Sequence, residues 1–293
     1  MNTVDLLDSH LSYVEAGEGD TTVVLLHGNP TSSHIWRHVI PRISGAARVI
    51  APDLIGMGAS GKPDIAYEYA DHAAYLEAFL EALGVANPVL VGYDWGGSLA
   101  LDWAASRHAA KRPGRARGVV LMETFLRPMT WSEFPAGAVE FFRTLRTPGA
   151  GEQMALEENW FIENALRATN GGISDEDLAV YRKPYPDPAS RKPLLAWPRQ
   201  IPLAEDGGVH EPAAVAERFR AYGDWMARTP DVPKLLLTAG PNGLGSPAMI
   251  AWAREHVAGL EVASIGEEVG HHAPEDAPEA IADAVLGLLG RLA

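Results

Sequence analysis

The chain of 293 residues is long enough to bury a substantial core. Its 47% hydrophobic and 21% charged residues are typical of a globular protein and argue against a disordered or fibrous one. The formal net charge of −14 disfavours nucleic acid and anionic membrane surfaces as main partners, whereas small neutral substrates remain compatible. Since the chain has no cysteine, disulfides, thiolate metal sites and cysteine nucleophiles are excluded.

The N-terminal residues show no secretory signal. Residues 1–11 carry Asp5, Asp8 and His10 instead of a basic segment followed by an apolar run. Further along the chain, Gly, Pro and charged residues interrupt every apolar run before it reaches the roughly 18 residues of a membrane span. We therefore expect a soluble, cytoplasmic protein without a membrane partner.

Short apolar runs alternate with helical patterns in the first part of the chain. The runs are rich in β-branched and aliphatic residues, as buried strands are, and occupy residues 22–26, 48–51, 88–91 and 118–122. Apolar residues recur at helical spacing over residues 32–43 and 70–83, and a further helix begins near Gly96. This alternation predicts an α/β protein whose mostly parallel sheet is covered by helices on both faces.

The alternation stops after Glu123. Residues 124–212 are rich in aromatic residues and proline, and they contain short helical patterns but no convincing strand. The helical patterns lie near residues 138–145 and 152–166. Strands and helices then resume, at residues 234–238, 248–256, 260–265 and 278–292. We therefore predict a core domain of residues 1–123 and 213–293 and an inserted helical cap domain of residues 124–212.

The segment Gly92-Tyr93-Asp94-Trp95-Gly96 joins an apolar run to a helical pattern. Small flanking residues permit the tight strand-to-helix turn called a nucleophile elbow, which projects its central side chain. Here that side chain is the carboxylate of Asp94, which can displace a leaving group from carbon and form an alkyl ester. The alternative is that Asp94 only caps the following helix.

The loop His27-Gly28-Asn29-Pro30 follows the first of these predicted strands. In a fold with a nucleophile elbow, this loop approaches the elbow and supplies a backbone donor, to which Asn29 adds a side-chain amide. By itself, the loop would be interpreted as a proline-containing turn with a self-capping Asn. Trp95 adds an indole N–H beside Asp94, and the two donors together can hold a departing halide.

Two adjacent histidines, His271 and His272, lie between the last predicted strand and the final helix. A catalytic triad on this type of fold has its base late in the chain and in such a loop. An isolated histidine in a surface loop usually has no catalytic role, but this position favours one of the pair as the general base.

The carboxylate partner of the histidine is harder to place. Its commonest position follows the strand at residues 234–238, yet residues 239–246 contain neither Asp nor Glu. Glu123 stands at the end of the strand before the insertion, on the edge of the sheet where ligands bind in open α/β folds. The other interpretation of Glu123 is an ordinary surface carboxylate at the end of a strand.

The chain resembles the haloalkane dehalogenase family of the α/β-hydrolase fold, in particular the branch whose catalytic acid is a Glu before the cap. The resemblance covers essentially the whole chain, the cap included. The matching segments are His27-Gly28-Asn29-Pro30-Thr31-Ser32-Ser33, Ala51-Pro52-Asp53-Leu54-Ile55-Gly56-Met57-Gly58, Asp94-Trp95-Gly96, Met122-Glu123 and Leu195-Ala196-Trp197-Pro198-Arg199-Gln200-Ile201-Pro202.

The resemblance implies a role for five residues: Asp94 as nucleophile, His271 as base, Glu123 as acid, and Asn29 with Trp95 as the halide-stabilising pair. The implied reaction hydrolyses a haloalkane to a primary or secondary alcohol, halide and a proton through an alkyl ester on Asp94. It implies no cofactor and no metal, and its partners are the substrate, water and halide. The oligomeric state stays open.

The family pattern also distinguishes the two histidines. It resembles Gly-x-His-Phe followed two residues later by Glu-Asp, so that anchoring on Glu275-Asp276 selects His271 and puts His272 in the Phe place. Other departures are Tyr93, where His or Gln is usual, Ala273-Pro274 after the histidines, and a longer basic segment near residues 111–115. These departures bear on substrate preference more than on the type of reaction.

Three other functions compete with this one. An epoxide hydrolase also uses an elbow Asp with a His–acid pair, but it needs cap tyrosines to protonate the epoxide oxygen, and the cap contains Tyr181 and Tyr185. A coelenterazine-type luciferase has a closely similar triad on the same fold. A ligand-binding protein could retain the pocket without turnover.

Overall fold

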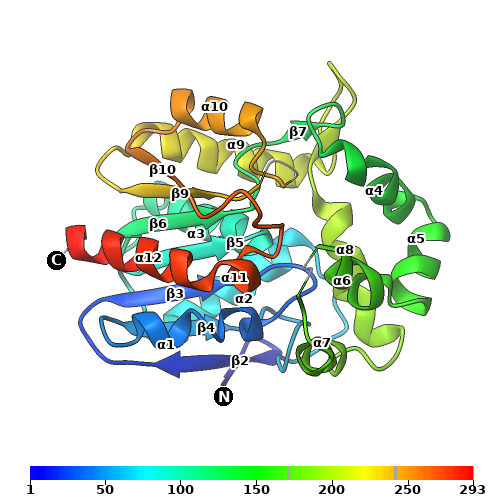
Figure 1. The fold of residues 1–293 in the computed structure, drawn as a ribbon, viewed down its shortest axis with the longest axis horizontal. Helices are drawn as coiled ribbons and strands as arrows, with labels where there is room; N and C mark the ends of the chain where they lie inside the picture. The colour runs from blue at the N-terminus through cyan, green and yellow to red at the C-terminus, as the bar shows by residue number, and fades with distance from the viewer. Residues whose placement is uncertain (170–171, 241–242, 293) are drawn as a thin grey trace.

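The computed structural model describes residues 1–169, 172–240 and 243–292, and a central eight-stranded sheet organises it (Figure 1). The strand order is β1-β2-β4-β3-β5-β6-β9-β10. The strands are β1 (Asn2–Leu6), β2 (Ser9–Ala16), β3 (Thr22–Leu26), β4 (Arg48–Pro52), β5 (Val89–Tyr93), β6 (Gly118–Met122), β9 (Lys234–Thr238) and β10 (Leu260–Ser264). The six strands β4, β3, β5, β6, β9 and β10 pair with their neighbours in parallel. The pairs β1–β2 and β2–β4 are antiparallel. This mostly parallel sheet confirms the predicted α/β class.

Helices cover both faces of this sheet: Figure 1 shows α12 in front of the strands and α3 behind them. The core helices are α1 (Ile40–Ile43), α2 (Tyr69–Ala82), α3 (Trp95–Ala109), α9 (Ala213–Arg228), α10 (Pro247–His256), α11 (Ala273–Asp276) and α12 (Pro278–Leu292). Every residue of β5 and β6 is buried. Because a parallel strand covered on both faces has no solvent side, its sequence is a continuous apolar run.

The register of the central strands brings their carboxyl ends together. Leu26 of β3 pairs with Gly92 of β5, and Tyr93 pairs with Met122 of β6. The residues that follow β3, β5 and β6 therefore meet at one edge of the sheet, where open α/β folds bind their ligands.

The segment after β6 folds into short helices that lie beyond this edge of the sheet (Figure 1). They are η2 (Ala136–Ala138), α4 (Val139–Arg146), α5 (Ala150–Glu152), η3 (Gln153–Glu157), η4 (Phe161–Ala165), α6 (Leu166–Thr169), α7 (Asp175–Arg182), η5 (Ala189–Arg191) and α8 (Lys192–Gln200). The segment also contains a two-stranded parallel pair, β7 (Met129–Thr130) and β8 (Leu203–Ala204). The expectation of no strand was thus wrong in this detail, because strands of two residues are too short to show a pattern.

Two predicted helices are broken in the structure. The helical pattern at residues 32–43 divides into η1 (Ser33–Trp36) and α1, because Pro41 has no N–H to continue the hydrogen bonds of a preceding turn. The pattern at residues 152–166 is interrupted at Asn159, whose φ of 52° is left-handed and cannot belong to a helix. Within the described residues, no helix has both the length and the apolar composition needed to cross a membrane.

Candidate active site

Asp94 occupies the sharp turn between β5 and α3, with a φ of 50°. The glycines around it are needed for steric reasons. A Cβ atom on Gly92 would lie 2.4 Å from the Cα of Gly97, and one on Gly96 would lie 2.1 Å from the carbonyl oxygen of Leu26. The predicted elbow turn is therefore present, and it projects the side chain of Asp94 beyond the edge of the sheet.

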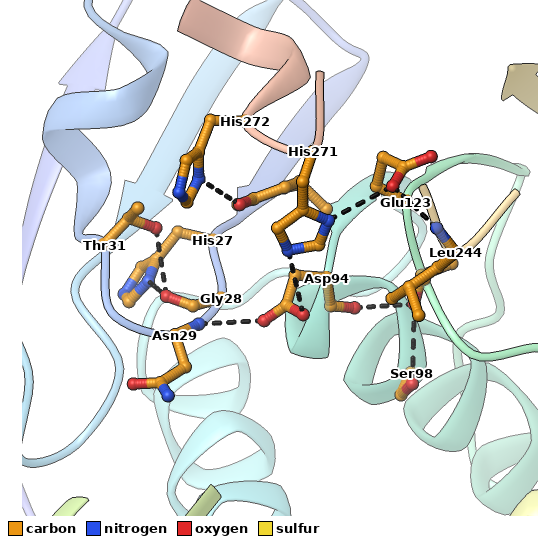
Figure 2. A network of polar contacts seen from close by, with 12 residues as sticks. His27, Gly28, Asn29, Thr31, Asp94, Ser98, Glu123, Leu244, His271 and His272 are labelled. Atoms are coloured by element: carbon orange, nitrogen blue, oxygen red, sulfur yellow. Dashed lines mark hydrogen bonds and ion pairs between the residues drawn. The ribbon is translucent and has the colours of Figure 1, made fainter. Parts of the chain in front are cut away.

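Asp94 is only 6% exposed, and backbone donors hold its carboxylate. The N–H of Asn29 donates to Asp94 Oδ1 at 2.9 Å (Figure 2). Burial raises the pKa of Asp94 to about 6, although the charge of His271 and the N–H groups of Trp95 and Asn29 act in the opposite direction. A Cβ on Gly28 would lie 2.1 Å from Oδ1, so this loop can approach the carboxylate only with glycine at that position.

His271 lies between two carboxylates (Figure 2). Its Nδ1 is 3.1 Å from Glu123 Oε2, where its N–H donates, and its Nε2 is 3.7 Å from Asp94 Oδ2. Burial lowers the pKa of His271, but the hydrogen bond that His271 donates to Glu123 and the charges of Asp94 and Glu123 outweigh this effect, so that the pKa lies above its usual 6.5. The structure thus brings together Asp94, His271 and Glu123, and it puts His271 rather than His272 between the carboxylates.

The loop after β9 encloses Glu123, although this loop is the commonest position for the acid itself. The N–H of Leu244 donates to Glu123 Oε2 at 2.9 Å, and the N–H of Gly245 donates to Oε1 at 3.4 Å. A Cβ on Gly243 would lie 2.1 Å from Glu123 Oε2. The loop therefore supplies donors and space for the carboxylate instead of an acid of its own; its residues 241 and 242 lie outside the described residues.

Sequence reasoning missed this function of the loop. The glycines at 243 and 245 were the available signal, because a glycine-rich turn can present backbone N–H groups to an anion. The carboxylate of Glu123 is 1% exposed, which contradicts its interpretation as a surface residue at the end of a strand.

The expected halide donors, Asn29 and Trp95, both line a cavity next to Asp94. Within the described part of the chain, no acceptor is bonded to the Trp95 indole, which stacks on Trp197 with ring centroids 4.5 Å apart. The Asn29 amide nitrogen donates to the carbonyl oxygen of Leu194 at 3.3 Å, and since an amide carries two hydrogens, one donor remains for a ligand.

The cavity has a volume of about 280 Å³ and is mostly apolar. Its polar groups are concentrated at the sheet edge, and its remaining wall is largely aromatic, with Phe125, Phe134, Phe141, Phe142, Trp160 and Phe161. Such a cavity suits a small apolar ligand whose reactive end meets a few polar groups. Among the described residues, no cluster of three or more His, Asp or Glu is arranged to hold a metal ion.

Comparisons with known proteins agree with this geometry. The family described as alpha/beta hydrolase fold matches residues 21–255. A haloalkane dehalogenase of Mesorhizobium japonicum is 45% identical over 98% of this chain and 90% of its own length, and one of Bradyrhizobium diazoefficiens is 44% identical over 96% and 91%. The chain belongs to the haloalkane dehalogenase family.

Solved structures of haloalkane dehalogenases have the same fold. The enzyme DbeA from Bradyrhizobium elkanii superimposes with a TM-score of 0.91 at 41% identity, covering 99% of this chain and 97% of its own. The haloalkane dehalogenase DatA from Agrobacterium tumefaciens also gives a TM-score of 0.91, at 35% identity over 100% and 96%. The resemblance inferred from the sequence motifs is therefore confirmed for family and fold.

Two of the residues that depart from the dehalogenase pattern, Tyr93 and His272, contact each other. Tyr93 and His272 are both buried, and the Tyr93 hydroxyl lies 2.5 Å from His272 Nδ1. Burial, reinforced by the neighbouring His271, lowers the pKa of His272 well below 6.5. His272 is therefore a neutral ring at the cavity wall and has no contact with Glu123 of the kind that His271 makes.

Proposed function

We propose that this haloalkane dehalogenase hydrolyses small haloalkanes to an alcohol, halide and a proton through a covalent alkyl ester on Asp94. The observation that carries the proposal is a buried carboxylate at the end of an apolar cavity, facing a histidine that a second carboxylate holds. In the first step, Asp94 attacks the carbon that bears the halogen, and the carbon–halogen electron pair leaves with the halide. The Trp95 indole and the Asn29 amide stabilise the charge that develops on the halogen.

The second step regenerates the carboxylate. His271 Nε2 removes a proton from water, which attacks the carbonyl carbon of the ester, and collapse of the tetrahedral intermediate releases the alcohol. The N–H of Asn29, which contacts Asp94 Oδ1, stabilises the oxyanion. Formation of the ester also neutralises Asp94 and so removes one of the charges that raise the pKa of His271, which favours the neutral base when it is needed.

We also propose that residues 124–212 act as a cap domain over a core domain of residues 1–123 and 213–293. The supporting observation is that the cavity wall combines Phe134, Phe141 and Trp160 of this segment with Asp94 and His271 of the core. A mostly apolar site removes water from around the carboxylate of Asp94, which makes it a stronger nucleophile in the first step.

Epoxide hydrolysis, the second candidate, is less well supported. Of the two tyrosines that would have to protonate an epoxide, Tyr181 donates its hydroxyl hydrogen to Glu275 at 2.6 Å. Neither Tyr181 nor Tyr185 is among the described residues that line the cavity. A test with chloro-, bromo- and iodoalkanes in parallel with epoxides, measuring halide and diol, separates the two: halide release supports dehalogenation, and diol without halide contradicts it.

The rate of the first step is expected to fall as the pH drops through about 6. Burial raises the pKa of Asp94 to about 6, and a protonated carboxyl group cannot attack carbon. Halide release in a single turnover, followed by rapid quench from about pH 5 to 8, gives the profile. A first-step rate that stays constant across this range would contradict the assignment of Asp94.

Replacement of Glu123 by Gln is expected to slow ester hydrolysis by on the order of 10²- to 10⁴-fold and the alkylation step much less. The carboxylate orients His271 and stabilises its protonated form, which only the second step requires. Rapid quench separates the two rates. Glu267→Gln and Glu268→Gln, two exposed residues of the loop before His271, are made in parallel and are expected to hydrolyse the ester normally. Normal hydrolysis in Glu123→Gln together with slow hydrolysis in one of these two variants would move the acid to that residue.

A further inference from the structure

Tyr93 and His272 form a buried polar pair that has no task in the two proposed steps. Their contact joins Tyr93 Oη and His272 Nδ1 at 2.5 Å. Tyr93 has no exposed surface and His272 is 2% exposed, so neither is satisfied by bulk water. The pair lies next to His271, from whose ring the rings of Tyr93 and His272 are each 5.4 Å away between centroids.

The Tyr93 hydroxyl determines which nitrogen of His272 carries the proton. Burial, with the charges of Asp94 and Glu123, raises the pKa of Tyr93 well above 10, so the hydroxyl keeps its hydrogen and needs an acceptor. Within the described residues, His272 Nδ1 is its recorded partner. If Nδ1 carried the proton, the buried hydrogen of Tyr93 would have no acceptor, which is costly. The hydroxyl therefore donates to Nδ1, and the proton of the neutral ring is on Nε2.

His272 lies at the wall of the cavity next to Asp94. His272 is one of the residues that line it, together with Asn29 and Asp94. Within the described part of the chain, no acceptor bonds to Nε2, yet this atom is not fully enclosed by the protein. It therefore has accessible surface, and the cavity is where His272 meets open space. The site thus contains a third neutral donor beyond those of Asn29 and Trp95.

We propose that His272 Nε2–H binds a hydrogen-bond acceptor on the substrate chain, so that the enzyme favours haloalkanes that carry an ether, carbonyl or hydroxyl oxygen. The inference rests on the proposed dehalogenation. A plain alkyl chain that fills the aromatic cavity removes water from Nε2–H without replacing its hydrogen bond, which penalises binding. A chain with an oxygen at the matching position restores the bond, and in an apolar cavity such isolated polar groups set specificity.

The test compares bromoalkanes with isosteric bromoethers in which an oxygen replaces one methylene group at successive positions along the chain. The quantity measured is the ratio of kcat/KM for ether and alkane, in the wild-type enzyme and in H272F. Dividing one ratio by the other cancels both the intrinsic reactivity of the ether and any general loss of activity in the variant. At the best oxygen position, the wild-type ratio is expected to exceed that of H272F by about two- to tenfold.

Two further variants distinguish the donor from a structural effect. H272Q retains a donor and is expected to recover part of the ether preference, while Y93F frees the His272 proton to occupy either nitrogen and is expected to reduce it. If circular dichroism shows that H272F does not fold, the ether-to-alkane ratio of Y93F tests the role of the His272 donor instead. Equal losses for ether and alkane in H272F, or an unchanged ratio in Y93F, overturn the proposal. Absence of halide release by the wild-type enzyme from either series contradicts the proposed function instead.

Discussion

Replacement of His271 by Phe is expected to stop the cycle after about one halide per active site, with little alcohol formed. The first step needs no proton transfer from Asp94, so alkylation continues, but no base then faces the ester. His271 is the residue whose Nε2 lies 3.7 Å from Asp94 Oδ2. The measurement mixes the variant with a reactive bromoalkane and quantifies halide, alcohol and the mass of the peptide that contains Asp94, which gains the alkyl group.

His272→Phe is the matched control for this experiment. The neighbouring ring contacts Tyr93 rather than Glu123, so this variant is expected to retain multiple turnover. Multiple turnover in His271→Phe together with ester accumulation in His272→Phe would reverse the assignment of the two histidines. If neither variant forms an adduct on Asp94, the covalent mechanism loses its main support.

Replacement of Trp95 by Phe is expected to slow alkylation by about 10²- to 10³-fold, as is typical for loss of one preorganised donor to a developing charge. The substitution removes the indole N–H and keeps an aromatic ring in the cluster with Trp197 and Phe125. Halide release in a single turnover measures the effect, which should be larger for a chloroalkane than for an iodoalkane because the smaller halide binds donors more strongly.

Trp197→Phe provides the comparison, since the Trp197 indole donates to the sulfur of Met57 and is not among the described residues that line the cavity. Trp197→Phe perturbs the same aromatic stack without removing a donor from the cavity, so a much smaller decrease in the alkylation rate is expected. Equal alkylation rates in Trp95→Phe and the wild-type enzyme, with both folded, would exclude the indole as a halide donor.

The central part of the fold could be predicted because its determinants are local. Strands β3, β5 and β6 are buried on both faces, so each is an uninterrupted apolar run bounded by turn residues. The N-terminal strand β1 is an exposed edge strand, in which only two of five residues are partly buried. Such a strand depends on its partner β2 for its structure, and the alternation of Val4 and Leu6 with exposed Asp5 is too short to identify it from the sequence.

The site could likewise be predicted where its determinants are local in the sequence. The elbow at Asp94 has a local signature, since its glycines are required within a few residues of the turn. Two other features of the site have no local signature. The N–H of Leu244 donates to Glu123 across a separation of 121 positions, and Tyr93 contacts His272 across 179 positions. Contacts at such separations arise only from the folded arrangement of the strands and loops, and spacing along one sequence contains no record of them.

The close fit between Glu123 and the loop after β9 restricts how the acid of such a site can change during evolution. The space beside His271 Nδ1 admits one carboxylate, and a single methyl group at position 243 would already collide with it. Moving the acid to the loop therefore needs at least two substitutions, one that empties position 123 and one that fills the loop. If position 123 changes first, the intermediate protein has no carboxylate beside His271. If the loop changes first, two carboxylates compete for the space of one. The acid at position 123 and the glycine at position 243 therefore depend on each other.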